Sequence, residues 1–205
     1  MRIILLTIFG TLFACTFYQT AQDNFFLDAI ILLVIAIVGI IIFIWTTIRD
    51  TKEYKVYRNI ICYVPTFIGL LFITANIWLV IYQNSRTDSP TLISGFYDGG
   101  FNGFKVDFKT DGSYLMSNGS GLGQNYFYGK YTIKDSIITI DKSNIDNCIE
   151  TNTLVIRTEN YFMTDAIEGK KYKANYIAQI DANGNEINKD FRFRVREDNR
   201  YYSNK

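Results

Sequence analysis

The sequence contains no histidine, only two prolines and only three cysteines. The absence of histidine excludes Ser-His-Asp and Cys-His catalysis, imidazole metal sites and histidine-based pH switching. The cysteines are Cys15, Cys62 and Cys148, and the first two lie in apolar segments. The rest of the chain therefore holds one thiol and cannot form an internal disulfide. We expect no metal, no cofactor and no enzymatic activity.

An excess of charge is also missing, because the net charge of the 205 residues is +1. Residues 1–83 are dominated by Ile, Leu, Phe and Val, whereas residues 84–205 are rich in Tyr, Asn, Gly, Asp and Lys. Basic and acidic residues balance in the second segment. Without a basic excess we expect no nucleic-acid partner, and without an acidic excess we expect no disorder.

Two long hydrophobic runs indicate membrane spans. Residues 29–45 carry no charged side chain, and residues 60–82 form a second uncharged stretch. At about 1.5 Å per residue, residues 25–48 and 60–82 are each long enough to cross a hydrocarbon core of about 30 Å. Helices buried in a soluble core would be shorter or would show a polar face. Both runs are therefore predicted to cross the membrane, which makes the lipid bilayer a partner of the chain.

The N-terminal segment leaves two interpretations open. Residues 3–18 are apolar after Arg2 and fit either a further span or a cleaved signal peptide. The run from Leu12 to Cys15 resembles a bacterial lipobox, which implies that Cys15 is lipidated after cleavage. Because two further spans make a lipid anchor superfluous, we favour a retained helix. The sequence thus predicts two or three transmembrane helices within residues 1–83.

Orientation follows from the loops. Residues 49–58, between the two long runs, hold four basic residues in ten, whereas residues 19–24 hold none. The positive-inside rule therefore places residues 49–58 in the cytoplasm and the C-terminal region outside it. Asn76 lies inside the last span, where we expect an interhelical hydrogen bond in preference to an ion path. The predicted location is the cytoplasmic (inner) membrane of a bacterium.

A pattern of period two begins after a polar linker at residues 84–90. Phe104, Val106 and Phe108 alternate with polar residues, and the Asp111-Gly112 pair then indicates a hairpin turn. Further strands are predicted at 92–97, 114–117, 126–133, 136–141, 153–158, 175–180 and 191–196. About eight short antiparallel strands at this spacing favour a β-barrel or a β-sandwich over residues 91–205.

One run within this region resembles a known pattern. It combines a strand ending in F-x-x-D-G-x-Y with a following G-x-Y-x-I strand and a D-x-I-x-I strand. The residues concerned are Phe108, Asp111, Gly112, Tyr114, Gly129, Tyr131, Ile133, Asp135, Ile137, Thr139 and Ile140. In this it is similar to the lipocalin-like or META-like β-domains of uncharacterised bacterial membrane proteins. The resemblance covers about 40 residues; it implies a fold and an extracytoplasmic location, and it carries no catalytic residues.

Several residues are candidates for a binding site. Arg192, Arg194 and Arg196 alternate with apolar residues, so one strand face could contact an anionic partner. The alternative, which we favour, is an edge strand protected from pairing by its charge. Six tyrosines could line a binding surface or belong to the core: Tyr126, Tyr128, Tyr131, Tyr161, Tyr172 and Tyr176.

Two loops imitate ligand-binding motifs. Residues 119–123 are glycine-rich but lack the Lys-Ser/Thr and the helix of a phosphate loop. Residues 181–185 resemble the start of a calcium loop, but position twelve is Arg192 where a glutamate is needed. Both are predicted to be turns.

The sequence leads to three hypotheses about function. The first is a membrane-anchored binding module that contacts a protein, a peptide or an envelope component, for example as an immunity protein or accessory subunit. The second is a carrier or sensor of a small ligand inside a lipocalin-like cavity. The third, an enzyme that uses carboxylates alone, lacks a recognisable pair. A ligand cavity favours the second hypothesis, and a filled interior with exposed aromatic residues favours the first.

Overall fold

The three apolar runs of the sequence form three helices. The structure, a computed structural model, describes residues 1–162 and 171–200. The helices are α1 (Arg2–Thr20), α2 (Phe26–Tyr57) and α3 (Val64–Ser85), with a short extended segment, β1 (Asp23–Phe25), and a 3-10 turn (Ile60–Tyr63) between them. All three helices are long and apolar enough to cross a membrane. They belong to the first of two units, Met1–Asp88 and Ser89–Lys205.

Helix α2 is longer than the sequence predicted. It continues through residues 49–57, which were expected to form a connector, and Arg58 follows its last residue with a φ of 52°. Arg49 and Glu53 lie one turn apart with 3.5 Å between Nε and Oε1, an arrangement that supports helical structure outside an apolar span. Helix α3 carries Pro65 in its first turn, where the missing N–H has no intrahelical partner to lose.

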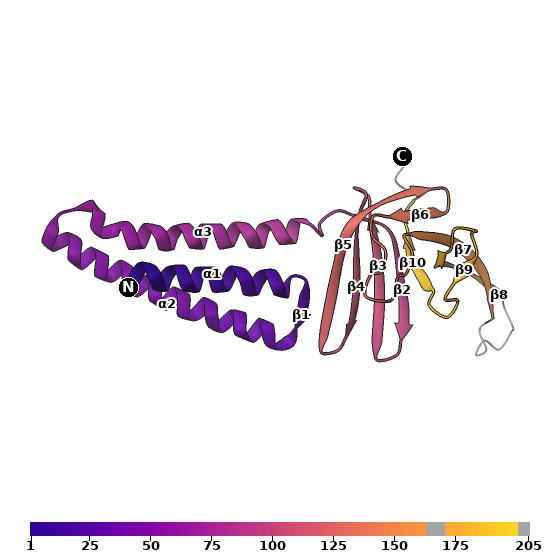
Figure 1. Ribbon diagram of the computed structural model, residues 1–205, viewed down its shortest axis with the longest axis horizontal. Coiled ribbons are helices and arrows are strands. Elements are labelled where there is room, and N and C mark those ends of the chain that lie inside the picture. The colour runs from indigo at the N-terminus through magenta and orange to yellow at the C-terminus, as the bar shows by residue number, and fades with distance from the viewer. Residues whose placement is uncertain (163–170, 201–205) are drawn as a thin grey trace. The chain divides into compact units, whose positions relative to one another are not determined.

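The second unit is built from short antiparallel strands (Figure 1). The main strands are β2 (Thr91–Gly99), β3 (Asn102–Lys109), β4 (Ser113–Ser120), β5 (Gly123–Lys134), β6 (Ile137–Ile140), β7 (Thr153–Phe162), β8 (Lys171–Ile180) and β10 (Phe193–Asp198). A two-residue strand, β9 (Glu186–Ile187), pairs with β8. The eight predicted strands are confirmed, with shifts of a few residues at their ends.

These strands close into a barrel. Their order is β5-β4-β3-β2-β10-β8-β7-β6, and β6 pairs in turn with β5 through Tyr131 opposite Ile140. The barrel is thus the correct one of the two predicted architectures. The expectation that the arginine-rich strand is an edge strand was wrong, because β10 pairs with β2 on one side and β8 on the other.

The alternating pattern of the sequence fills the barrel. Phe104, Val106 and Phe108 of β3 are at most 1% exposed. They belong to one cluster whose other members are Ile93, Tyr114, Met116, Tyr131, Ile138, Ile140, Ile145, Ile149, Leu154, Ile156, Ile177 and Phe193. All eight main strands contribute side chains to this cluster, and in β3, β4, β6 and β7 these are alternate residues, so the period-two pattern there marks the core.

The spacing of the hairpin motif has a local physical explanation. Gly112 adopts a φ of +80°, and its carbonyl accepts a hydrogen bond of 2.8 Å from the Tyr131 backbone N–H. Asp111 accepts hydrogen bonds from Ser113 and Ser89, and these lower the pKa of its carboxyl to about 2. The Tyr131 hydroxyl donates to the Lys109 carbonyl at 2.6 Å, and burial raises its pKa to about 12.

One tyrosine of the motif also connects β4, β5 and the residue that follows β6. The Tyr114 hydroxyl donates to Oδ1 of Asp141 at 3.0 Å, and its ring passes over Gly129. A Cβ at position 129 would overlap the Tyr114 hydroxyl, so the glycine is needed for this contact. The residues that carry the resemblance are therefore residues of the turn and the core.

We predict that Gly112→Val lowers the free energy of unfolding by about 1–3 kcal/mol, because a β-branched residue resists a positive φ. Gly121→Val is the matched control, since Gly121 lies in a neighbouring turn without positive φ and no atom lies within 4 Å of its Cβ position. Urea unfolding of the purified protein, followed by circular dichroism, measures both. Equal effects of the two substitutions would contradict the assignment of this turn.

Candidate functional site

The barrel interior is occupied by side chains of the barrel itself. Its largest fully buried residues include Tyr114, Phe104, Phe108 and Phe193. The segment that joins β6 to β7, residues 141–152, adds Ile145 and Ile149 to the same cluster. We call this segment the plug. A lipocalin-like cavity needs this volume to be empty, so the packing argues against a ligand inside the barrel.

Polar contacts fasten the plug to the barrel. The fully buried side chain of Gln179 on β8 donates to the Cys148 carbonyl at 2.8 Å and accepts from the Glu150 backbone N–H at 2.7 Å. On β4, Asn118 donates to the carboxylate of Asp146. The sequence analysis made no prediction for this segment. The pair of isoleucines four residues apart within it was the signal that it packs inward.

Two exposed apolar side chains stand at neighbouring hairpin turns. Phe101, between β2 and β3, is 76% exposed, and Leu122, between β4 and β5, is 64% exposed. The two turns lie at the same end of the barrel, because β3 and β4 pair between them up to Gly103 opposite Gly119 (Figure 1). We call Phe101 and Leu122 the tip residues. Large apolar groups in glycine-rich turns add nothing to the core and are available to a partner.

The three candidate arginines do not form a uniform row. Arg192 precedes β10, Arg194 lies opposite Phe96 of β2, and a bulge between Val195 and Glu197 interrupts the alternation at Arg196. The guanidinium of Arg196 stacks on the ring of Phe96 at 4.4 Å from its centroid. The structure thus separates their environments, and contact of the three with an anionic partner stays a prediction.

Arg192 is already engaged by acidic residues of the barrel unit. Its Nη2 lies 2.6 Å from Oε2 of Glu186, its Nη1 lies 3.2 Å from Oε2 of Glu159, and it stacks on Tyr176 at 4.5 Å. Burial opposes ionisation of Glu186, but hydrogen bonds from Arg192 and Tyr176 still hold its pKa below the ordinary value. This cluster is neutralised from within, so Arg192 is the poorest of the three for binding an external anion.

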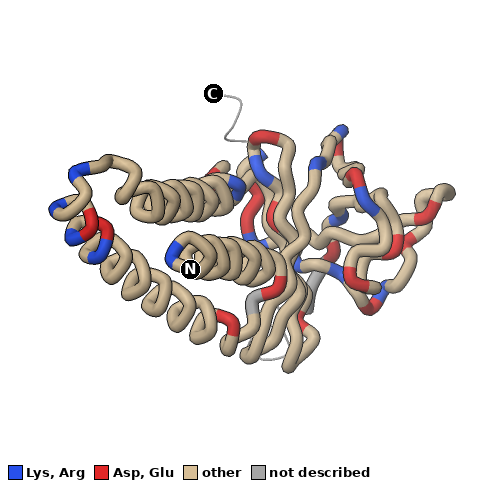
Figure 2. Tube along the Cα trace, turned by 60° about the vertical axis from the view of Figure 1, so that its left-hand side comes forward, with Lys and Arg blue, Asp and Glu red and all other residues tan. Residues whose placement is uncertain are grey.

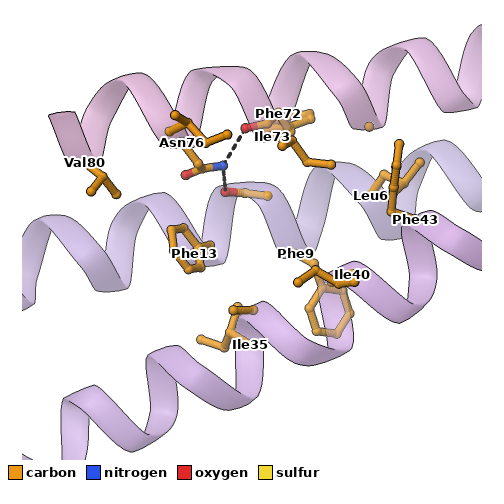
Figure 3. Close-up of a pocket in the computed structure, with 15 residues that line it drawn as sticks. Leu6, Phe9, Phe13, Ile35, Ile40, Phe43, Phe72, Ile73, Asn76 and Val80 are labelled. Atoms are coloured by element: carbon orange, nitrogen blue, oxygen red, sulfur yellow. Dashed lines mark hydrogen bonds between the residues drawn. The ribbon is translucent and has the colours of Figure 1, made fainter. Parts of the chain in front are cut away.

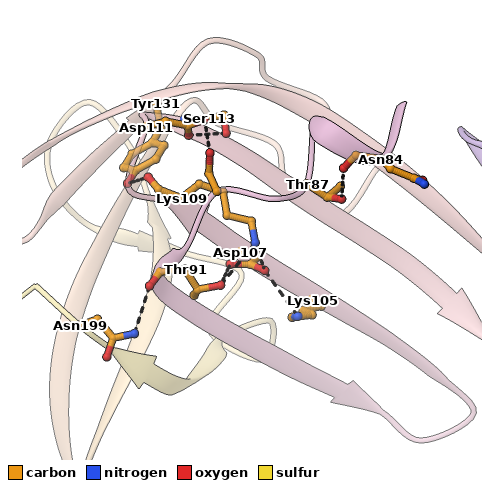
Figure 4. Close-up of polar contacts among 11 residues, drawn as sticks. Asn84, Thr87, Thr91, Lys105, Asp107, Lys109, Asp111, Ser113, Tyr131 and Asn199 are labelled. Carbon is orange, nitrogen blue, oxygen red and sulfur yellow. Dashed lines mark hydrogen bonds and ion pairs between the residues drawn. The ribbon is translucent and has the colours of Figure 1, made fainter. Parts of the chain in front are cut away.

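An ion pair lies on the polar face of β3. Lys109 Nζ is 3.0 Å from Oδ2 of Asp107, and the Thr91 hydroxyl donates to Oδ1 of Asp107 at 2.8 Å (Figure 4). Both charged side chains are buried. The alternating pattern correctly placed Asp107 and Lys109 on the polar face of the strand. It could not show that the two side chains form an ion pair.

The remaining candidates are placed as follows. Residues 119–123 comprise the end of β4, the turn at Gly121 and Leu122, and the first residue of β5. The Asp181 carboxylate accepts from the backbone N–H groups of Asn185 at 2.8 Å and Asn183 at 2.9 Å, which lowers its pKa.

Of the tyrosines, Tyr131 is buried, Tyr126, Tyr128 and Tyr176 are half-buried, and the side chains of Tyr161 and Tyr172 lie outside those described. Within the described residues, no group of three acidic residues or cysteines could hold a metal ion.

In the helical unit, charge is concentrated at the α2–α3 turn (Figure 2). There the Asp50 side chain is fully buried, and its carboxylate pairs with the Arg2 guanidinium. It also accepts from the backbone N–H of Thr66 at 3.0 Å and from its hydroxyl at 2.6 Å. Arg2 extends the network to Glu53 at 2.7 Å. One carboxylate therefore joins all three helices.

Asn76 makes the second polar contact of the bundle. Its Nδ2 donates to the Phe72 carbonyl in the preceding turn at 2.8 Å and to the Gly10 carbonyl of α1 at 3.3 Å. The amide is thus placed between α3 and α1, as an interhelical contact requires.

Cys15 is exposed on α1. Cleavage before it, as lipidation requires, would remove Arg2 and Gly10 and leave the carboxylate of Asp50 without its guanidinium. Lipidation at Cys15 and this three-helix bundle are therefore mutually exclusive, and the contacts of α1 support the retained helix.

Comparisons of the chain with protein-family models, with curated proteins and with solved structures find no match. The function must therefore be argued from the geometry above.

We predict that Asp50→Leu destabilises the bundle by about 3 kcal/mol, because it leaves Arg2 and Thr66 without their shared acceptor. Glu53→Gln, which weakens only the more exposed end of the network, should have a much smaller effect. Unfolding of the purified protein in mixed micelles, titrated with a denaturing detergent, gives both values. A negligible effect of Asp50→Leu would show that this network does not hold the helices together.

Proposed function

We propose that the protein is a membrane-anchored, non-enzymatic interaction module whose barrel contacts a protein, peptide or envelope component outside the cytoplasm. The supporting observation is a barrel with a filled interior and exposed apolar side chains at its tip. An immunity protein or an accessory subunit would have this form. A barrel without an interior site must act through its outer surface.

The closed sheet restricts how a partner is bound. A partner strand can add to a sheet only at a free edge, and pairing with β6 takes up the end of β5 from Tyr131 to Lys134. Recognition at the tip therefore depends on side chains, and exposed apolar side chains contribute binding free energy when a partner removes them from water. Phe101 and Leu122 are the residues of the barrel that best meet this description.

The small-ligand alternative makes a specific structural demand. A cavity would open only if the plug left the barrel, which breaks the hydrogen bonds of Gln179 and exposes Ile145 and Ile149. This cost is the reason that we rank the carrier hypothesis second.

The extracytoplasmic location is part of the proposal. It rests on the four basic residues at positions 49–58, which the positive-inside rule places in the cytoplasm of a bacterial inner-membrane protein. Helix α3 follows these residues and is long enough to cross the membrane, so the barrel comes after it on the extracytoplasmic side.

The orientation predicts a labelling pattern in intact spheroplasts. After the three native cysteines have been replaced by serine, a cysteine introduced at Asn183 should react with a membrane-impermeant thiol reagent. A cysteine at Lys52 should stay unlabelled until the membrane is opened with detergent. Both positions are exposed, so accessibility alone does not separate them. The reverse pattern would place the barrel in the cytoplasm.

If the tip residues contact a partner, replacing both with serine should weaken the binding of that partner. Affinity purification of the full chain from detergent-solubilised membranes, with quantitative mass spectrometry, should recover a component with the native protein. Phe101→Ser combined with Leu122→Ser should reduce that component about tenfold or more, since each side chain contributes about 1.5–3 kcal/mol when buried.

Ile137→Ser is the control for this experiment. Ile137 is 45% exposed and starts β6 next to the β5–β6 turn, at the barrel end opposite the tip. Its substitution should leave recovery unchanged. A double tip variant that retains every component enriched by the native protein would rule out the tip as the contact surface.

A further inference from the structure

Charged side chains gather in the last turns of α2 (Figure 2), and the acidic ones are turned inward. Asp50 is fully buried and pairs with Arg2 of α1. It thus faces the interior of the bundle, like the amide of Asn76, which is directed from α3 toward α1 (Figure 3). Glu53 pairs with the same Arg2 guanidinium at 2.7 Å. Both carboxylates of this segment are therefore held by a cation from another helix.

The basic side chains of the same turns lie on the opposite face. At about 100° per residue, Lys52 is about 200° around the helix axis from the buried Asp50. Arg49 and Lys55 are each three residues from Lys52 and so lie about 60° to either side of it. All three side chains are exposed. We call Arg49, Lys52 and Lys55 the basic face of α2.

Apolar side chains continue the basic face toward the middle of the membrane. Ile41, Trp45 and Ile48 are exposed and fall on the same side of α2 by the same helical spacing. In a bilayer they contact acyl chains, and Trp45 is of the residue type that is enriched at the membrane interface. Lys52 follows Ile48 by four residues, which is about 6 Å along the axis. The basic face therefore begins where the hydrocarbon ends, at the depth of the lipid phosphates.

The basic face is not neutralised from within the protein. The ammonium groups of Lys52 and Lys55 form no ion pair or hydrogen bond within the described residues. Arg49 Nε is 3.5 Å from Oε1 of Glu53, but the Arg49 side chain is 56% exposed, and an exposed pair of this kind is weak. Its guanidinium also lies over the Trp45 ring, 5.6 Å from the centroid. Three positive charges are thus available to an external anion.

We propose that the basic face of α2 binds the headgroups of anionic phospholipids in the leaflet that surrounds this end of the helix. Arg49, Lys52 and Lys55 attract the headgroup charge, while Trp45 and Ile48 contact the acyl chains of the same lipid. A soluble anionic partner would match the three bases but not the apolar residues beside them. The phosphate of a zwitterionic lipid is compensated by its own ammonium group, so it is held less firmly. This inference goes beyond the proposed function, and it holds for either orientation of the chain.

Trp45 provides a reporter at the site. The only other tryptophan is Trp78, so Trp78→Phe leaves a single fluorophore in the full-length protein. This protein is reconstituted in vesicles of equimolar phosphatidylglycerol and phosphatidylcholine. Two preparations have the same composition, but dibrominated acyl chains, which quench tryptophan fluorescence, are carried by one lipid or by the other. The difference in quenching then measures which lipid occupies the surface next to Trp45.

Brominated phosphatidylglycerol should quench Trp45 more strongly, with a preference of about fivefold or more over phosphatidylcholine. Near an anionic surface a single Lys or Arg contributes about this factor. The preference should fall as the salt concentration rises, because the headgroup region is screened. Equal quenching in the two preparations would overturn the proposal and leave the basic face to a soluble partner.

Substitutions locate the preference on the basic face. Arg49→Gln, Lys52→Gln and Lys55→Gln together should make the quenching by the two lipids equal. Lys52→Gln with Lys55→Gln alone keeps the contact of Arg49 with Trp45 and should still remove most of the preference. Circular dichroism checks that each variant is folded. A preference that persists in either folded variant would contradict the proposal.

A matched control removes the same charge elsewhere. Lys130, Lys134 and Lys189 are exposed lysines of the barrel unit. Their combined replacement by glutamine changes the net charge of the protein as much as the triple variant of α2 does. It should leave the preference at Trp45 unchanged. An equal loss in this control would show that net charge, and not the basic face, selects the lipid.

Discussion

The pairing of β5 with β6 is the constraint on which the functional interpretation depends. By closing the sheet, it gathers side chains from eight strands into one enclosed cluster and leaves less of the sheet edge free for a partner strand. The plug then occupies the remaining interior with Ile145 and Ile149. A closed and filled barrel leaves only its outer surface and turns for recognition, and so the tip residues become the leading candidates.

In the helical unit, a few polar groups determine how the helices pack. Its helices are apolar on almost every face, so hydrophobicity cannot specify how they pack in lipid. Close contacts at Gly10 and Gly69, the carboxylate of Asp50 and the amide of Asn76 provide the specificity. The amide oxygen is buried and accepts no hydrogen bond within the described residues.

Much of this fold could be predicted from local sequence. Uncharged runs marked the helices, and alternation with the Asp111-Gly112 turn marked the strands and their inward faces. Periodicity could not predict the features that depend on residues far apart in the chain. These are the closure of the barrel, the inward course of the plug and the ion pair of Arg2 with Asp50. The arginine row failed as a simple pattern for the same reason: a bulge and the distant Glu186 give its members different surroundings.

The central claim is that the barrel is a separate folding unit that needs no lipid to satisfy its backbone. Its most direct test is the expression of residues 89–205 alone, followed by circular dichroism, sedimentation and urea unfolding. The account predicts a soluble, monomeric, β-rich domain that unfolds cooperatively. A segment that is unfolded, helical or soluble only in detergent would contradict it.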